Sequence, residues 1–450
     1  MKKVAFHNLG CKVNSYEMEY MQQEFEKNGY EIVPFAAIAD IYVVNTCTVT
    51  NIADRKSRQM LHQAKKRNPE ALVVAAGCYA QTADRDRTDA AVDLYVGNNR
   101  KKEIVTIVEE ALKEGRSQRK VIDDLTKPTE YEDLFLKKTM EHTRVSVKIQ
   151  DGCNQFCSYC IIPYARGRSR SRKKEDVLKE ITALASKGYK EVVLTGIHLS
   201  SYGIDLDKKA ASYNEMAAGC AFTNRELLDL ITEASKIPGI RRVRLGSLEP
   251  RIITEEFLRT LKETDAFCDH FHLSLQSGSD SVLKRMNRHY SAEEYLEKVS
   301  LIRSFYPAAA LTTDVITGFP GETEEEFEES RQFLTKAGFY EVHVFKYSRR
   351  KGTVADKMEG QLTESVKNAR SRILIEDGMK RKHDFLEKQI GKSVEVLAEE
   401  FVAHDNTAYL EGFSKNYIRC AIRTDEEREI ISGRIKGFLT DDILEVCADK

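Results

Sequence analysis

Residues 151–167 read DGCNQFCSYCIIPYARG and place three cysteines, Cys153, Cys157 and Cys160, within eight positions. No second Cys-x-x-Cys pair and no nearby histidine follows them, so the sequence does not offer the four ligands of a structural zinc site. Three thiolates instead suit a four-iron cluster whose fourth iron stays open to a substrate or cofactor. The spacing therefore predicts an iron–sulfur site that takes part in chemistry.

The cysteine loop follows the first of six predicted strands. Apolar, β-branched runs alternate with helical patterns, and every run but the last is followed by a helix. The runs are residues 143–150, 191–200, 241–250, 270–278, 311–321 and 341–350. Parallel strands with intervening helices predict a partial (β/α)6 barrel over residues 139–370, with its site at the carboxyl ends of the strands. The loop lies at such an end.

Three further cysteines, Cys11, Cys47 and Cys78, each follow a short apolar run, with helical patterns between the runs. This alternation predicts a parallel α/β sheet over residues 1–112. Because ligands of such sheets lie outside the carboxyl ends of the strands, all three thiols should reach one edge. Gly10 permits the tight turn that aims the next side chain at a ligand. Buried core cysteines are the alternative, but the shared edge favours a second three-thiolate cluster.

The remaining segments look structural. Residues 113–138 are charged and weakly periodic, which is typical of a linker. Residues 371–450 begin with a long charged helix and continue in five short strands, which predict a small antiparallel β-barrel or sandwich. The other four cysteines have no close partner in sequence, and we expect no ligand role for them: Cys220, Cys268, Cys420 and Cys447.

Length and composition set outer limits. The 450 residues suffice for about three domains. Seventy Lys+Arg balance seventy-one Asp+Glu, so contact with an acidic partner has to be local. No apolar run approaches the ~20 residues of a membrane span, and the start lacks a signal-peptide core. We expect a cytoplasmic protein without membrane contact, in whose reducing surroundings ten cysteines are not a disulfide framework.

The motifs resemble the radical S-adenosylmethionine (SAM) methylthiotransferases across essentially the whole chain. The loop CNQFCSYC by itself resembles the radical SAM signature, in which SAM chelates the open iron. The other matching stretches are GCKVNSYEME (10–19), NTCTVT (45–50), GCYAQ (77–81), LQSGSDSVLKRMNRHY (275–290), VITGFPGETEEEF (315–327) and FKYSRRKGT (345–353). Together these stretches are highly specific for that family.

The resemblance implies two 4Fe-4S clusters, SAM, and a C-terminal TRAM domain, a small β-barrel that binds RNA, within residues 371–450. The radical SAM cluster would be held by Cys153, Cys157 and Cys160, and the auxiliary cluster by Cys11, Cys47 and Cys78. These cofactors, and no acid–base side chain, would carry the chemistry. Family members contact SAM at barrel strand ends, and the alternative for each such residue is an ordinary strand-end role. The residues at these ends are Gly196, Glu249, Ser274 and Gln276.

Within the family, GCKVNSYE (10–17) and GIHLSSYG (196–203) are most similar to a branch that acts on transfer RNA. That branch converts N6-threonylcarbamoyladenosine next to the anticodon, at position 37, into its 2-methylthio derivative with two SAM molecules. Lys12 and Val13 differ from the GCQMN-like motif of the isopentenyladenosine branch. The alternatives are that branch, methylthiolation of a ribosomal-protein aspartate, or a non-catalytic iron–sulfur RNA-binding sensor.

RNA binding requires positive charge, which gathers directly after the cysteine loop. Residues 166–174 contain four Arg and two Lys with no acid, whereas residues 383–450 contain nine Lys+Arg and fifteen Asp+Glu. A charge run is usually a solvated face, but a phosphate backbone would have to pass here. We expect RNA contact from Arg166, Arg168, Arg170, Arg172, Lys173 and Lys174. Expected partners are tRNA and an electron donor such as flavodoxin or ferredoxin, and we expect a monomer.

Overall fold

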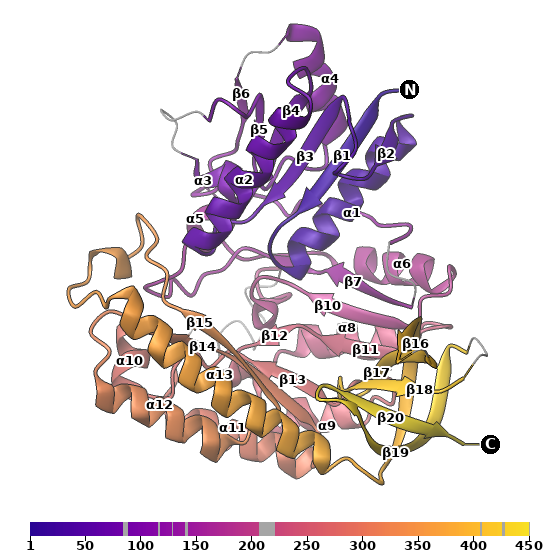
Figure 1. The fold of residues 1–450 in the computed structure, drawn as a ribbon, viewed down its shortest axis with the longest axis vertical. Helices are drawn as coiled ribbons and strands as arrows, with labels where there is room; N and C mark the ends of the chain where they lie inside the picture. The colour runs from indigo at the N-terminus through magenta and orange to yellow at the C-terminus, as the bar shows by residue number, and fades with distance from the viewer. Residues whose placement is uncertain are drawn as a thin grey trace.

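The computed structural model describes residues 1–449 except 84–88, 116–117, 128, 140–142, 207–220, 406 and 425–427. Cys220 lies outside the described residues. Figure 1 shows an N-terminal sheet above a partial barrel, with a small closed barrel at one side of the latter. The predicted α/β architecture is confirmed.

The N-terminal sheet is parallel throughout, in the order β2-β1-β3-β4-β5-β6. Its strands are β1 (Lys3–Asn8), β2 (Glu31–Val33), β3 (Ile41–Thr46), β4 (Leu72–Gly77), β5 (Leu94–Val96) and β6 (Arg119–Val121). Its main helices are α1 (Lys12–Lys27), α2 (Asn51–Arg67) and α4 (Ile104–Glu114). The first and last of these share a core on one face, and α2 packs on the other. β3 and β4 are buried at every residue because both faces are covered.

Two parts of the segment predicted as a linker, residues 113–138, pack into the N-terminal domain instead. β6 extends the sheet beside β5, and Leu134 and Leu136 are buried in the core that α1 and α4 line. The sequence pattern hides β6 because short edge strands are often charged and need no apolar alternation.

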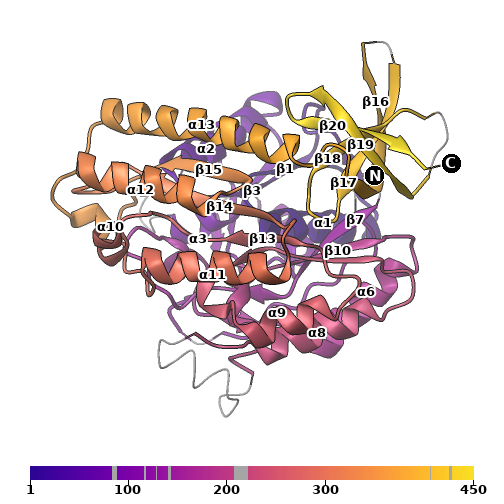
Figure 2. The same ribbon diagram turned by 90° about the horizontal axis from the view of Figure 1, so that it is seen from below.

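The middle region forms the predicted six-stranded partial barrel. Two parallel groups, β11-β10-β7 and β12-β13-β14-β15, are joined by contacts of β11 with β13. The strands are β7 (Arg144–Lys148), β10 (Glu191–Thr195), β11 (Arg242–Leu245), β12 (Ser247–Leu248), β13 (His270–Leu273), β14 (Ala310–Thr317) and β15 (Glu341–Lys346). β11 and β12 share one strand position, interrupted at Gly246. Helices cover the outside (Figure 2): α6 (Lys174–Ala185), α8 (Arg225–Ser235), α9 (Glu255–Lys262), α11 (Ala292–Phe305) and α12 (Glu324–Ala337).

Helix α13 (Glu364–Glu387) runs along β15 and leads into a closed barrel of order β16-β17-β18-β20-β19. Its strands are β16 (Ser393–His404), β17 (Thr407–Ser414), β18 (Arg419–Ile422), β19 (Ile430–Thr440) and β20 (Ile443–Ala448). The predicted antiparallel barrel is confirmed except that β18 pairs with β20 in parallel; its likeness to a TRAM domain stays a prediction. Arg242, the first residue of β11, donates to the Phe413 carbonyl (2.7 Å), so this barrel contacts the amino ends of the middle strands. No described helix is long and apolar enough to cross a bilayer.

Candidate functional site

The cysteine loop leaves the carboxyl end of β7 and is closed at its base by the antiparallel pair of β8 (Gln150–Asp151) and β9 (Arg170–Ser171), after helix α5 (Ile162–Arg166). Hydrogen-bond donors point at its sulfur atoms. The Gln155 backbone N–H donates to Cys153 Sγ (3.5 Å), and Arg288 Nη1 donates to Cys157 Sγ (3.2 Å). Burial raises the pKa of Cys153 to about 12. A bound metal deprotonates such a thiol, and donors to sulfur are typical around iron–sulfur ligands, so the loop fits a cluster.

Two predicted SAM contacts, Ser274 and Gly196, have structural roles that the sequence did not reveal. The Ser274 carbonyl accepts hydrogen bonds from Tyr290 OH (2.6 Å) and Arg288 Nη2 (3.4 Å), which ties the end of β13 to the cysteine loop. A Cβ on Gly196 would lie 2.9 Å from the Gln150 side chain, so packing alone requires glycine there.

Glu249, a third predicted SAM contact, is buried at the end of β12 and faces the cysteine loop. Its Oε2 accepts from Gln155 Nε2 (3.4 Å) and lies 3.4 Å from His198 Nε2. Burial alone would raise the pKa of Glu249, but hydrogen bonds from His198 and Arg251 hold it below its usual range. The structure therefore places an ionised carboxylate beside the first triad.

Gln276, the fourth predicted SAM contact, lines a cavity of about 210 Å³. Its φ of +74° is uncommon for a residue other than glycine and is often found at functional sites. The cavity is also lined by Tyr159, the residue before Cys160, and by Val49, two residues after Cys47. It therefore lies at the contact between the cysteine loop and the N-terminal sheet.

The second triad forms at the carboxyl ends of β1, β3 and β4, which are adjacent strands. The chain leaves β1 and β3 toward opposite edges, and open parallel sheets bind ligands at such a switch point. A Cβ on Gly10 would lie 3.1 Å from Cys47 Cβ, so the turns that carry Cys11 and Cys47 are in contact. Burial, followed by the nearby Cys78 and Cys11 thiols, raises the pKa of Cys47 to about 11. The structure thus brings the three predicted thiols together.

A buried ion network lies beside the second triad and joins the N-terminal sheet to the partial barrel. Arg166 donates to both carboxylate oxygens of Glu17 on α1 (2.8 and 3.0 Å). Lys148 on β7 reaches Glu17 and Asp151 (2.7 Å each), and Lys101 also pairs with Glu17. These side chains are 0 to 3% exposed. Arg170 also lies 3.5 Å from Asp151, so four cations surround two carboxylates, and this excess of positive charge would compensate the thiolates of a bound cluster.

Asn98 connects the second triad to the segment that follows the first. Its Nδ2 donates to Cys78 Sγ (3.4 Å) and to the Ala165 carbonyl (2.7 Å). Ala165 lies on α5, which begins two residues after Cys160. One side chain therefore contacts a thiol of the second triad and the segment that follows the first.

The basic segment after the loop is only partly available to RNA, and the predicted contact set needs correction. Arg166, Arg170 and Arg172 are 0, 5 and 1% exposed. Arg172 pairs with Glu180, and the other two lie in the network around Asp151. A packed turn directs these side chains inward, which a charge run in the sequence does not show. The accessible members are Arg168 and Lys173, with Lys174 paired to Glu233.

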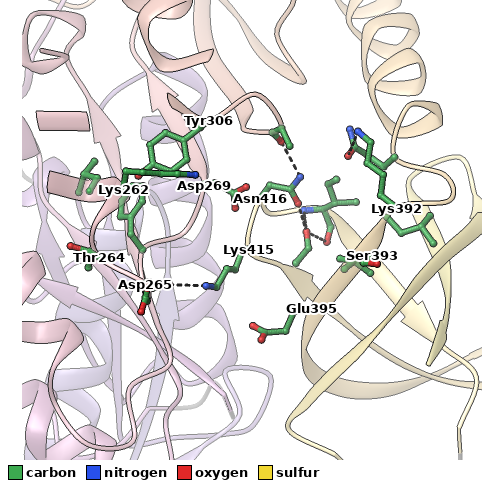
Figure 3. A pocket seen from close by; sticks show the side chains of 18 residues that line it. Lys262, Thr264, Asp265, Asp269, Tyr306, Lys392, Ser393, Glu395, Lys415 and Asn416 are labelled. Carbon is green, nitrogen blue, oxygen red and sulfur yellow. Dashed lines mark hydrogen bonds between the residues drawn. The ribbon is translucent and has the colours of Figure 1, made fainter. Parts of the chain in front are cut away.

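A separate cavity of about 470 Å³ lies where the closed barrel meets the partial barrel (Figure 3). Lys415 donates to the Asp265 carbonyl (2.8 Å) and Asn416 to the Ala308 carbonyl (3.2 Å) across this junction. Its lining residues come from the partial barrel and the closed barrel, and none of them belongs to the cysteine loop or the N-terminal sheet, so this cavity is not part of the thiol site.

Sequence reasoning missed Glu17, Asn98, Lys101 and Arg288. Glu17 had a usable signal, because it occupies the apolar face of α1 among buried tyrosines, where a charge implies a buried partner. The other three come from loops whose sequence carries no periodicity, and only the fold brings them to sulfur or to the network.

Comparison with known proteins agrees with this geometry. Residues 147–334 match the radical SAM superfamily, and residues 3–97 match a family described as uncharacterized protein family UPF0004. The structure is similar to a radical SAM methyltransferase, TsrM from Kitasatospora setae, with a TM-score of 0.53 at 17% identity over 79% of this chain and 77% of that one. That likeness supports the fold.

Full-length relatives are closer in sequence. The threonylcarbamoyladenosine tRNA methylthiotransferase MtaB of Bacillus subtilis is 39% identical over 95% of this chain and 92% of its own. The Aquifex aeolicus MtaB is 42% identical over 88% and 93%. A tRNA-2-methylthio-N(6)-dimethylallyladenosine synthase of Clostridium perfringens is 35% identical over 92% and 90%. The chain therefore belongs to the radical SAM methylthiotransferase family, a group of sulfur-inserting transferases.

Proposed function

We propose that this protein converts N6-threonylcarbamoyladenosine at position 37 of tRNA, next to the anticodon, into its 2-methylthio derivative. The Bacillus and Aquifex relatives are named for this substrate, and GCKVNSYE at residues 10–17 favours the same branch. The observation that carries the proposal is the hydrogen bonding of Asn98, which joins Cys78 of the second triad to the segment that follows the first. Replacing one C–H bond by a C–S bond requires hydrogen abstraction and sulfur transfer at the same carbon, which two adjacent triads allow.

Each triad would hold one 4Fe-4S cluster: Cys153, Cys157 and Cys160 the radical SAM cluster, and Cys11, Cys47 and Cys78 the auxiliary cluster. When bound, the clusters and two SAM molecules supply hydrogen abstraction, the sulfur atom and its methyl group. No protein acid or base is required. An electron donor such as flavodoxin or ferredoxin would deliver the electrons that SAM cleavage consumes, in a cytoplasmic, monomeric enzyme.

The side chains around the first triad would place SAM. Arg288 donates a hydrogen bond to Cys157 Sγ (3.2 Å) and would stabilise this sulfur as a cluster ligand. The ionised Glu249 would accept hydrogen bonds from the SAM ammonium group. The apolar cavity beside Tyr159 and Gln276 suits the adenosyl part. Gly196 would contribute backbone contacts at the end of β10, and Ser274 its side-chain hydroxyl at the end of β13.

The RNA would approach over the segment that follows the cysteine loop, where Arg168 and Lys173 are exposed. Phosphate contacts from such residues position an RNA without reading its bases. The target base would leave its stack to reach the space between the triads, as bases do in other enzymes that modify them.

Mass spectrometry of tRNA nucleosides tests the proposal. Deletion of the gene should remove the 2-methylthio derivative and leave N6-threonylcarbamoyladenosine to accumulate. Reintroducing the wild-type gene should restore the 2-methylthio derivative. Loss of 2-methylthio-isopentenyladenosine would assign the other tRNA branch. Unchanged tRNA with loss of a methylthiolated ribosomal aspartate would contradict an RNA substrate, and lack of 5′-deoxyadenosine with SAM and a reductant would favour a sensor.

A further inference from the structure

Tyr164 lies on α5, the helix that follows the first triad and is joined to Cys78 of the second through Asn98, and it remains accessible. It is 47% exposed although it sits on α5, four residues after Cys160. The next residue, Ala165, accepts the hydrogen bond of Asn98, which also reaches Cys78. Among the described residues, the Tyr164 hydroxyl has no hydrogen-bond partner. Nothing in the folding of α5 explains an open aromatic ring at this point.

Two further side chains with flat groups, Phe156 and Arg168, lie beside Tyr164. The Phe156 ring stands perpendicular to the Tyr164 ring, with 6.2 Å between centroids and 90° between planes. The Arg168 guanidinium lies over the Phe156 ring at 4.4 Å, and Arg168 is exposed. These three residues, the aromatic platform below, come from the cysteine loop and the segment after it.

Phe156 is held in this position against its backbone preference. Its φ is +48°, which is uncommon for an aromatic residue and costs free energy. Asn287 Nδ2 donates to the Phe156 carbonyl (3.1 Å), and this contact fixes the turn. The turn and this contact together hold the Phe156 ring in a fixed position beside Cys157.

We propose that the aromatic platform stacks an unpaired nucleobase of the anticodon loop, next to the target base, and so positions that base between the triads. This inference rests on the proposed function and names residues that would contact the substrate tRNA. Loop bases stack on aromatic rings and on arginine planes. The surroundings are suited to RNA, because residues 167–174 carry no acid and Arg168 and Lys173 are exposed.

The test uses an anticodon stem-loop RNA with 2-aminopurine placed in turn at each loop position except the target. Stacking quenches the fluorescence of 2-aminopurine, so the iron-loaded wild-type protein should quench the fluorescence of the probe at one loop position. Tyr164→Ala should remove that quenching and weaken binding roughly 10-fold, as expected for loss of one base stack. Tyr164→Phe should retain both. Arg168→Gln, which leaves both rings in place, should weaken binding to a smaller degree.

Met379→Ala is the matched control, because Met379 is an exposed apolar side chain on α13, 67% exposed. It should bind and quench as the wild type does. Equal iron content and circular dichroism would show that Tyr164→Ala is folded. Binding by Tyr164→Ala within about 2-fold of wild type, or wild-type protein without quenching at any position, would overturn the platform. Because binding is measured without turnover, preserved quenching in a protein that does not methylthiolate tRNA would refute the proposed function alone.

Discussion

The two thiol triads lie close together but in different surroundings. The first triad contacts one cation, Arg288, and borders a cavity of about 210 Å³ with a buried carboxylate nearby. The second borders a closed network in which Arg166, Lys148 and Lys101 surround Glu17. Space beside the first triad suits a ligand that enters and leaves. The network beside the second fixes the sheet to the barrel, so the two sites stay in register.

Replacing one ligand in each triad should separate the two activities most strongly. Cys157→Ala should abolish formation of 5′-deoxyadenosine and hence methylthiolation, because SAM loses its open iron. Cys47→Ala should keep 5′-deoxyadenosine formation and lose sulfur insertion. Anaerobic reconstitution should give about eight irons in the wild type and about four in each variant. Loss of SAM cleavage in a folded Cys47→Ala protein would contradict this division.

Breaking the network should cost more stability than any exposed ion pair. Glu17→Gln removes the carboxylate that Arg166, Lys148 and Lys101 share, and removal of one partner of a buried pair costs roughly 3–5 kcal/mol. Chemical denaturation measures the loss. Glu255→Gln is the control, since the exposed Glu255–Arg259 pair on α9 is worth about 1 kcal/mol or less. Equal effects of the two substitutions would show that the network does not hold the interface.

Arg288→Gln should lower the reduction potential of the first cluster and leave that of the second cluster unchanged. The lost hydrogen bond to Cys157 Sγ no longer stabilises the reduced, more negative cluster, so its reduction potential should fall. A hydrogen bond with a net contribution of ~0.5–1.5 kcal/mol corresponds to a change in reduction potential of roughly 20–60 mV for one electron. Redox titration followed by electron paramagnetic resonance measures both clusters. A shift confined to the auxiliary cluster would reverse the assignment.

The smallest effect concerns the basic segment, where exposed and buried cations should behave differently. Lys173 is exposed, so Lys173→Gln should leave stability unchanged. It should reduce the slope of log K for RNA binding against log salt concentration by about one unit. Arg170→Gln should instead destabilise the protein, because Arg170 is 5% exposed beside Asp151. Equal salt slopes for Lys173→Gln and the wild type would remove Lys173 from the RNA surface.

Local chemistry was predictable from the sequence, and long-range packing was not. The spacing of Cys153, Cys157 and Cys160 defines a ligand set within one loop, and strand-end patterns place Cys11, Cys47 and Cys78 at one edge. Both follow from periodicities of a few residues.

Burial of Arg166 could not be predicted because its partner Glu17 lies on α1, 149 residues away. Arg170 and Arg172 pair with the nearer Asp151 and Glu180, but only the folded turn between β8 and α6 directs them inward. The strand β6 was missed because its charged run carries no apolar pattern. Asn98 was missed because its two partners, Cys78 and Ala165, meet only when the sheet docks on the barrel.

The central claim is that both triads act together on one tRNA base. Its most direct test is mass spectrometry of tRNA, isolated from the deletion strain, after incubation with reconstituted protein, SAM and a reductant. We predict a mass increase of N6-threonylcarbamoyladenosine that corresponds to one methylthio group, absent with Cys47→Ala. Methylthiolation that persists in Cys47→Ala, or an unmodified nucleoside with wild-type protein that cleaves SAM, would contradict the account.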